Sequence, residues 1–216
     1  MIAPIHVQLI LRIFLVSISN SKAGRMKGWN GLIWFVALVN NLILSGFTYM
    51  DITQFCPTIL QQTEELNSIR EQQYKVFKKQ NIRIGVFGLG IELNGLVNSS
   101  LYKETKYYDP IEITNEMTYK LKTEEKCDLI ICISHLGHTY SDDKISDLKL
   151  GSLTSDIDLI IGGHTHTLLK KPEIIKNSKN KEVIINQVGS NGVYVGKIDF
   201  NFSNFYKNYS DSLVEV

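Results

Sequence analysis

Cysteine is scarce in this sequence, which contains only Cys56, Cys127 and Cys132 among its 216 residues. Such an odd and sparse set excludes the disulfide framework that stabilises many small secreted domains. Cys127 and Cys132 flank an apolar segment, and free cysteines in that setting are commonly buried as small hydrophobic residues. Five positions apart on a strand, they are expected to point to opposite faces of a sheet. The pattern fits a reducing compartment and is compatible with the periplasm as well.

The sequence also lacks a basic tract. The formal net charge is +1, and its lysines occur at most in pairs, as at residues 78–79 and 170–171. This excludes a broad electrostatic attraction to a nucleic acid polymer or to an acidic membrane surface. Hydrophobic residues make up 44% and charged residues 21%, which are globular values for a chain with room for one ordinary domain. An anionic ligand would therefore be held by a local site.

Residues 1–50 lack the features of a standard secretory signal. Two apolar stretches occur, at residues 5–18 and 31–47, but no basic residue precedes Arg12, which interrupts the first stretch. The second stretch has 17 residues, the short limit for a membrane span. Three interpretations stay open for this apolar N-terminal region: a membrane or export segment, a buried helix, or residues foreign to the following domain because of a shifted gene start.

The rest of the chain is expected to fall into three parts. Residues 51–80 form a polar connector in which residues 61–73 could be a helix with few apolar anchors. Residues 81–203 carry the clear alternation of apolar and polar segments expected of a folded domain. Residues 204–216 look like a polar tail. The sequence shows neither an internal repeat nor a low-complexity linker.

Three short apolar runs predict buried strands. They lie at residues 82–90, 127–134 and 157–161, and the first and last end in glycines. A helix is predicted after Asp109, and residues 142–153 form a short helical or loop connection. Strands that alternate with helices indicate an α/β fold with a mostly parallel sheet.

The predicted helix after the first strand has clear start signals. Asp109 is suited to the N-cap, and Pro110 to the first helical position. Ile113, Met117 and Leu121 recur at four-residue intervals and give this helix one apolar face. We therefore expect it to pack on the sheet as a crossover.

Beyond the third strand, the pattern changes to antiparallel β-structure. Strand-like runs occur at residues 173–176, 183–187 and 193–202, and the turn-forming residues 177–181 predict a hairpin. The complete sheet is therefore expected to be mixed.

Histidines follow two of the predicted strands. His135 comes directly after one strand, and the Gly-Gly-His-Thr-His-Thr motif at residues 162–167 places His164 and His166 just after the next. In an open α/β sheet, loops at the carboxyl ends of the strands converge on one crevice. Since neutral imidazole is a good ligand for zinc, manganese and iron, we expect these three rings to form a metal site.

Small and hydroxylated neighbours fit this interpretation. Gly162 and Gly163 would let the backbone turn sharply out of the sheet without steric strain. An extended backbone would place both rings of the His-x-His pair on one side, each near one of two ions. The hydroxyls of Ser134, Thr165 and Thr167 could orient the rings through outer-shell hydrogen bonds.

A lone histidine beside a glycine is more often a loop residue or a hydrogen-bonded core residue than a ligand. His138, which follows Gly137, is therefore expected in a solvated loop, and His6 is expected to have no site role. The grouping of the other three histidines at strand ends favours the metal site for them.

The strand-end motifs resemble a known family. Residues 133–137 and 157–167, together with the flanking runs 84–89 and 186–199, are similar to the later metal motifs of calcineurin-like metallophosphoesterases. Within that family, they look most like the bacterial 5′-nucleotidase and 2′,3′-cyclic phosphodiesterase group. The resemblance covers residues 74–202, which correspond to the second half of the metallophosphatase domain.

The resemblance implies an incomplete metallophosphoesterase α/β sandwich with a mixed sheet. In the family, two divalent ions such as zinc, manganese or iron activate water and neutralise the phosphoryl oxygens. The resemblance implies that His135 and His164 bind one ion and His166 the other. It also implies that the substrate is a nucleotide or another phosphate ester, and that the location is periplasmic or membrane-associated, while the composition is equally compatible with the cytoplasm.

The motifs that the family draws from the first half of its domain are absent. The sequence contains no Asp-x-His, no Gly-Asp and no Asn-His pair. The bridging aspartate, the asparagine ligand and the histidine that assists catalysis therefore have no matching positions, and no catalytic residue is assigned. We expect a truncated or disrupted version of a hydrolase that holds at most one ion and is inactive unless an N-terminal half is supplied. A non-catalytic metal-binding or membrane-associated fragment is the alternative.

Overall fold

The structure is a computed structural model of residues 1–216. It describes residues 9–17, 35–40, 59–60, 73–79, 81–96, 98–102, 106–191, 193–202 and 207–215. Among the features considered above, His6, Cys56 and the part of the 61–73 helix before residue 73 lie outside these ranges.

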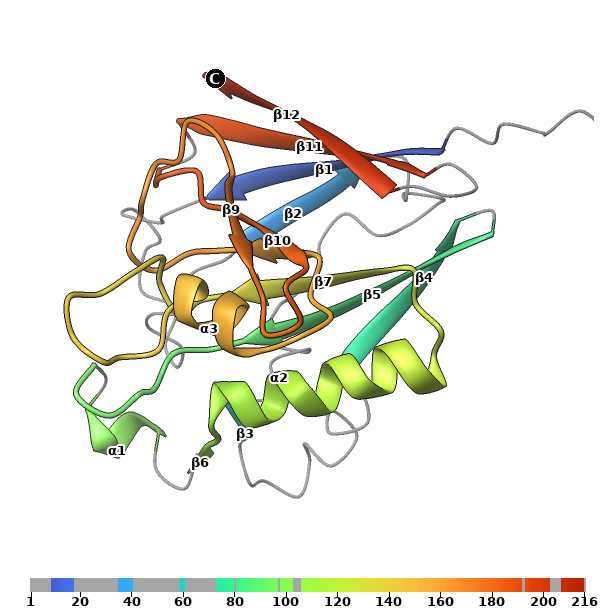
Figure 1. Ribbon diagram of the computed structural model, residues 1–216. Coiled ribbons are helices and arrows are strands. Elements are labelled where there is room, and N and C mark those ends of the chain that lie inside the picture. The colour runs from blue at the N-terminus through green and yellow to red at the C-terminus, as the bar shows by residue number, and fades with distance from the viewer. Residues whose placement is uncertain are drawn as a thin grey trace, which may run out of the picture.

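A six-stranded mixed sheet forms the centre of the fold (Figure 1). Its strands, in spatial order, are β4 (Tyr74–Lys79), β5 (Ile82–Leu89), β7 (Leu129–Ser134), β8 (Leu159–Ile161), β10 (Glu182–Asn186) and β9 (Glu173–Lys176). The four central strands are mutually parallel, and the edge strands β4 and β9 run antiparallel to their neighbours. The predicted mixed α/β fold is confirmed.

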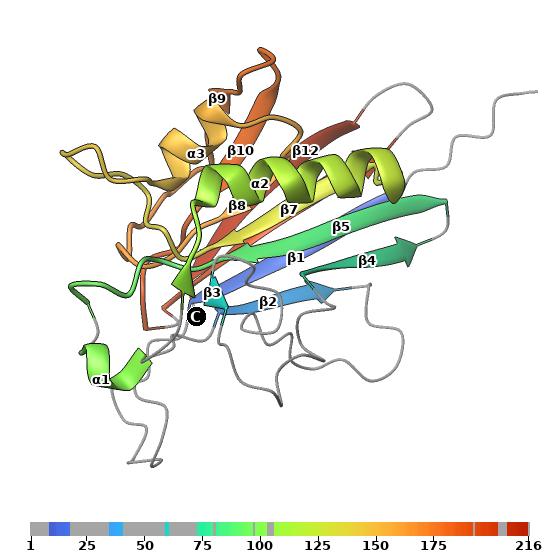
Figure 2. The same ribbon diagram turned by 90° about the horizontal axis from the view of Figure 1, so that it is seen from below.

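Helices cover one face of this sheet (Figure 2). Helix α2 (Pro110–Tyr119) begins after Asp109, whose side chain accepts hydrogen bonds from the backbone of Ile111 and Glu112. It continues as the π-helical turn η4 (Lys120–Glu124), where Leu121 is fully buried. Gly85 on β5 allows this approach, because a Cβ atom there would lie 2.7 Å from a methyl carbon of Leu121.

The second crossover helix, α3 (Asp147–Leu153), follows β7. Ser146 is its N-cap, and the Ser146 hydroxyl accepts a hydrogen bond from the Lys149 backbone N–H. Leu150 is fully buried in the core between the helices and the sheet. Both helical segments expected from the sequence are therefore present on the same side of the sheet.

Both central cysteines are buried on the helix side of the sheet. Cys127 and Cys132 are free and belong to the same core cluster, together with Met117 and Leu150. The expectation that they face opposite sides is wrong, because Cys127 precedes β7 and does not follow the strand alternation. Burial raises the pKa of the Cys127 thiol, so this residue behaves as a small core side chain.

A four-stranded antiparallel sheet covers the opposite face (Figures 1 and 2). Its order is β12 (Lys207–Glu215), β11 (Tyr194–Phe202), β1 (Leu9–Ser17) and β2 (Phe35–Asn40). Ile198 and Phe200 of β11 pack into the core between the two sheets. The molecule therefore has a helix layer, a mixed sheet and an antiparallel sheet, which is the expected sandwich.

This second sheet corrects two expectations. Residues 9–17 and 35–40 are strands, so the buried-helix interpretation does not hold for them. Residues 207–215 pair along β11 and do not form a free polar tail. Among the described residues, no helix is long and apolar enough to cross a membrane.

The remaining elements are short. Helix α1 (Ser99–Tyr102) lies between β5 and β6 (Lys106–Tyr107) in the chain. Strand β6 pairs with β3 (Ile59–Leu60) in a two-stranded sheet. More important for function, β5, β7, β8 and β10 all end at the same edge of the central sheet, because they are parallel. The loops that carry the histidines therefore leave the sheet side by side.

Candidate metal centre

His135 and His164 face each other at the carboxyl ends of β7 and β8. The Nε2 atom of His135 lies 3.3 Å from the Nδ1 atom of His164, and the two rings meet edge to face. His135 is anchored by its backbone N–H, which donates to the carbonyl of Leu89 at the end of β5. The pairing of β7 with β8 thus brings the two predicted ligands together.

The separation of these two nitrogen atoms fits a shared cation. Two imidazole nitrogens, each about 2.0–2.1 Å from a tetrahedral zinc ion, lie roughly 3.3–3.4 Å apart. A hydrogen bond between a protonated and an unprotonated ring nitrogen would give a similar distance. The 3.3 Å separation therefore suits both a direct hydrogen bond between the two rings and a divalent cation shared by them.

The electrostatic surroundings keep both rings neutral. Burial, followed by the nearby charges of His164 and His166, lowers the pKa of His135 to about 4. The pKa of His164 is also lowered, first by burial and then by Lys144 and His166. A neutral imidazole is the form that binds metal ions, so both side chains are in the ligating state at neutral pH.

The loop that carries His164 and His166 has an unusual backbone. His164 has φ of 68° and His166 has φ of 53°, both in the left-handed region that only a few per cent of non-glycine residues adopt. The Thr165 N–H donates to the Gly163 carbonyl and closes a three-residue turn centred on His164. The expected extended His-x-His segment is therefore wrong.

His166 lies near the histidine pair without completing a three-ligand group. Its charge influences the pKa of both His135 and His164, which places it within electrostatic range of them. Within the described ranges, however, no group of three or more His, Cys, Asp or Glu side chains could hold a metal ion. The structure thus joins two of the three predicted ligands directly.

Thr165 and Thr167 form hydrogen bonds within the loop and not with the histidine rings. Thr165 Oγ1 donates to Gln187 Oε1 at 3.0 Å and accepts from the His138 backbone N–H at 3.0 Å. The Thr167 backbone N–H also donates to Gln187 Oε1, and Gln187 Nε2 donates to the Gly163 carbonyl at 2.6 Å. Gln187, only 1% exposed, therefore holds both sides of the histidine turn.

Gln187 was missed at the sequence level. It follows β10 directly, as His135 follows β7, and this position was the available signal. A single glutamine belongs to no recognisable spacing pattern. Its contacts with the histidine turn are therefore visible only in the folded structure.

The two glycines before His164 have a different role from the one expected. Neither Gly162 nor Gly163 adopts a positive φ. A Cβ atom at Gly162 would lie 2.2 Å from Oδ2 of Asp147 and 3.2 Å from Nε2 of Gln187. Gly162 is therefore required because buried polar side chains approach its backbone closely.

His138 is buried and not solvated, contrary to expectation. It is 8% exposed, and its Nε2 atom lies 2.9 Å from Oε2 of Glu173 on β9. The preceding loop residue, Gly137, has φ of 99° and makes room for the Tyr140 ring. His138 thus joins the loop after β7 to the edge strand β9.

Known proteins are similar to this chain in sequence. The chain is 35% identical over 120 residues to the trifunctional nucleotide phosphoesterase protein YfkN of Bacillus subtilis, covering 56% of this chain and 8% of that protein. It is 31% identical over 153 residues to a 5′-nucleotidase of Vibrio vulnificus, covering 62% of this chain and 28% of that one. The chain is therefore similar in sequence to a nucleotide phosphoesterase protein and to a 5′-nucleotidase.

The fold of this chain is also similar to that of a solved 5′-nucleotidase structure. A 5′-nucleotidase precursor from Thermus thermophilus superposes with a TM-score of 0.60 over 74% of this chain and 33% of that chain, at 22% identity. The chain spans less than a third of the length of YfkN and of the Vibrio vulnificus 5′-nucleotidase. No family model matches the chain.

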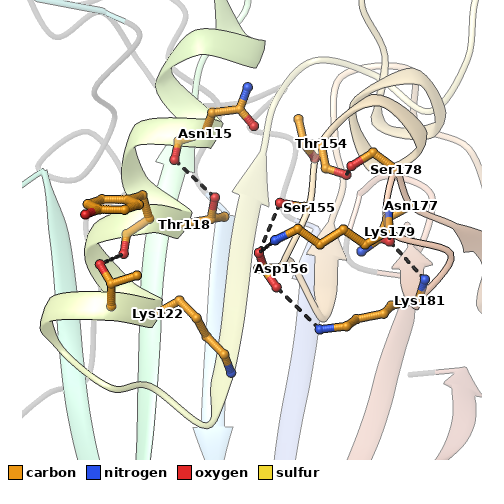
Figure 3. Close-up of polar contacts among 12 residues, drawn as sticks. Asn115, Thr118, Lys122, Thr154, Ser155, Asp156, Asn177, Ser178, Lys179 and Lys181 are labelled. Carbon is orange, nitrogen blue, oxygen red and sulfur yellow. Dashed lines mark hydrogen bonds and ion pairs between the residues drawn. The ribbon is translucent and has the colours of Figure 1, made fainter.

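A separate polar cluster lies at the other end of β8, where the strand begins (Figure 3). Asp156, which precedes β8, lies 2.5 Å from Nζ of Lys179 and 3.6 Å from Nζ of Lys181. Burial is the largest single influence on Asp156 and raises its pKa, but the hydrogen bonds from Lys179 and Ser155 and the charges of Lys179 and Lys181 together lower the pKa below its ordinary value. The β9–β10 hairpin is held here by ion pairs, which account for this cluster without a ligand.

Proposed function

We propose that this chain carries part of the active site of a metal-dependent phosphoesterase of the 5′-nucleotidase type. The observation that carries the proposal is the 3.3 Å contact between His135 Nε2 and His164 Nδ1 at the ends of adjacent parallel strands. Both rings are neutral, and their spacing suits one shared divalent cation. The names of the two curated relatives support a nucleotide phosphate ester as the substrate class.

A divalent cation in this position would neutralise phosphoryl oxygens and lower the pKa of water. The chain's own residues would fix its place: His135 and His164 as ligands, and Gln187 and Thr165 as the support of the histidine turn. His166 would serve a second cation, which needs further ligands. With a net charge of +1, the chain provides no broad basic surface, so the cations would bind the phosphate group.

The proposal includes a limit on what this chain does alone. Three imidazoles bring no negative charge, and the sequence has no Asp-x-His, Gly-Asp or Asn-His motif to supply carboxylate and amide ligands. Two dications close together require anionic ligands to offset their repulsion. We therefore propose that the chain alone binds one cation and hydrolyses phosphate esters only when those ligands are supplied in trans.

Metal binding is the first test. Calorimetry or elemental analysis with zinc or manganese should give one ion per chain, and His135→Ala and His164→Ala should each abolish binding. His138→Ala is the matched control, because His138 is a buried histidine that pairs with Glu173 instead. Absence of binding in the wild-type chain, or full binding in both site variants, would contradict the proposal.

Hydrolysis is the second test. A polypeptide corresponding to the N-terminal half of a 5′-nucleotidase domain would be mixed with this chain, manganese and a nucleoside monophosphate. Phosphate release in the mixture, absent with either component alone and lost in His164→Ala, would support catalysis. Metal binding without hydrolysis in the mixture would favour the alternative, a non-catalytic metal-binding module.

The location of the protein is a separate proposal. We propose a periplasmic or membrane-associated location from the resemblance alone. Cell fractionation with an epitope at the C-terminus tests it, and recovery of the full-length chain solely in the cytoplasmic fraction would overturn it.

A further inference from the structure

One buried carboxylate contacts the chain next to both histidine-bearing strand ends. Asp147 is the first residue of α3, its side chain is fully buried, and its backbone N–H donates to the Gly137 carbonyl at 2.8 Å. Among the described residues, Asp147 is the one buried aspartate. It contacts the end of β7 and the residue that follows β8.

The two oxygens of Asp147 meet two different strands. Its Oδ1 atom accepts a hydrogen bond of 2.5 Å from the hydroxyl of Ser134, the last residue of β7. Its Oδ2 atom lies against Gly162, the residue after β8, so closely that a Cβ atom there would be 2.2 Å away. Ser134 immediately precedes His135, and Gly162 lies two positions before His164.

The position at a helix start does not by itself explain this arrangement. An acidic side chain near the N-terminus of a helix is favourable even when it is exposed to solvent. Here the carboxylate is buried, and Oδ2 has no hydrogen-bond partner. Burying a polar oxygen without a partner is unfavourable, so the rest of the contact must compensate for it.

We infer that Asp147 is a positioning residue that sets the distance between His135 and His164. Its carboxylate contacts the chain just before each histidine, so the ends of β7 and β8 cannot shift relative to each other without disturbing it. This inference rests on the proposed function, because the distance matters most when the two rings share a cation.

The experiment compares Asp147→Ala and Asp147→Asn with Asp156→Ala. Asp156 is the matched control, since it follows the C-terminal end of α3, precedes β8 and pairs with Lys179 and Lys181. Cobalt(II) is the probe, because its visible spectrum reports the geometry of its nitrogen ligands. We expect Asp147→Ala to weaken cobalt binding about tenfold and alter the spectrum, as outer-shell changes commonly do.

Asp147→Asn should restore most of the wild-type spectrum, because the amide oxygen can still accept from Ser134 and fills the same space. Asp156→Ala should lower the melting temperature while leaving the spectrum and affinity unchanged. An unaltered cobalt spectrum in Asp147→Ala would overturn the inference while leaving the proposed function standing. If Asp147→Ala does not fold, Ser134→Ala replaces it, since it removes the same hydrogen bond.

A second measurement separates this inference from the proposed function. In the metal-free protein, the ring proton resonances of His135 and His164 should both shift in Asp147→Ala and stay fixed in Asp156→Ala. If the wild-type chain binds no cobalt, the proposed function fails, and these resonances still decide whether Asp147 positions the rings. Unmoved resonances would overturn the inference in either case.

Discussion

The Nε2 atom of His135 and the Nδ1 atom of His164 lie 3.3 Å apart, although 29 positions separate the two residues in the chain. The parallel pairing of β7 with β8 produces this contact, since Ile133 is paired with Ile161 just before the strands end. The side chains that follow each strand therefore start from the same level of the sheet. The sheet thus sets where each strand ends, and the turn after β8 carries His164 from there to His135.

The first prediction concerns the unequal contributions of His164 and His166 to metal affinity. His164→Ala should weaken zinc binding more than the roughly 10–100-fold typical of an outer-shell change, because it removes a direct ligand of the single proposed cation. His166→Ala should change the affinity by less than His164→Ala, because it does not complete a three-ligand group with the pair. Calorimetric titration of both variants measures the difference. Equal losses in the two variants would contradict the assignment of His135 and His164 to one ion.

The second prediction concerns acid. The pKa of His135 is lowered to about 4 by burial and by the nearby histidines, whereas the unfolded chain has an ordinary value near 6.5. Between these two values the unfolded state binds the proton and the folded state does not, so stability falls as the pH decreases from 6.5 to 4. The effect is at most about 1.4 kcal/mol per pH unit, reduced by the partial exposure of the ring.

Two measurements check this prediction. In the metal-free protein, the His135 ring protons should titrate with a midpoint near 4 by NMR spectroscopy. Urea unfolding should show a shallower acid-side decline in His135→Gln than in the wild type. A midpoint near 6.5 would show that the ring is more solvated than the structure indicates.

The third prediction is a coupled pair of substitutions. Gly162→Ala should destabilise the fold by roughly 1–3 kcal/mol, because the added methyl group overlaps the Asp147 carboxylate. In an Asp147→Ala background the same substitution should be much less harmful, giving a clear coupling energy in a double-mutant cycle. Gly85→Ala, which meets Leu121 instead, should show additive effects with Asp147→Ala. Additive behaviour of Gly162→Ala would indicate that the backbone relaxes around the methyl group.

The fourth prediction tests Gln187. Gln187→Glu keeps the acceptor for Thr165 but places a carboxylate oxygen opposite the Gly163 carbonyl, where the amide now donates at 2.6 Å. We expect a loss of roughly 1–3 kcal/mol at neutral pH, the usual effect of leaving buried polar groups unsatisfied. Urea unfolding measures it. Asn115→Asp, which changes an exposed amide on α2, is the control and should have little effect.

Much of the fold could be predicted because local signals and burial agree there. Asp109 and Pro110 mark the start of α2, and the apolar spacing identifies Met117 and Leu121 as core residues. In contrast, β12 has a polar sequence and is a strand only because β11 offers it a partner edge. Pairing of this kind depends on distant residues, so the polar segment alone gave no sign of it.

The candidate site shows the same division. Strand-end placement is visible in the sequence, and it led to His135 and His164. The role of Gly162 could not be read from the sequence, because it depends on the close approach of Asp147, which lies on a helix 15 positions earlier. His138 was assigned to solvent for a related reason, since its partner Glu173 lies on an edge strand 35 positions away.

The left-handed backbone at His164 and His166 has a consequence for how this turn could be improved. Asparagine and glycine adopt such angles more readily than histidine, and each strained residue costs of order 1–3 kcal/mol. A sequence chosen for robustness alone would therefore give up both imidazoles. Replacing both residues should therefore raise the thermal stability of the turn and remove two of the three imidazoles of the proposed metal site.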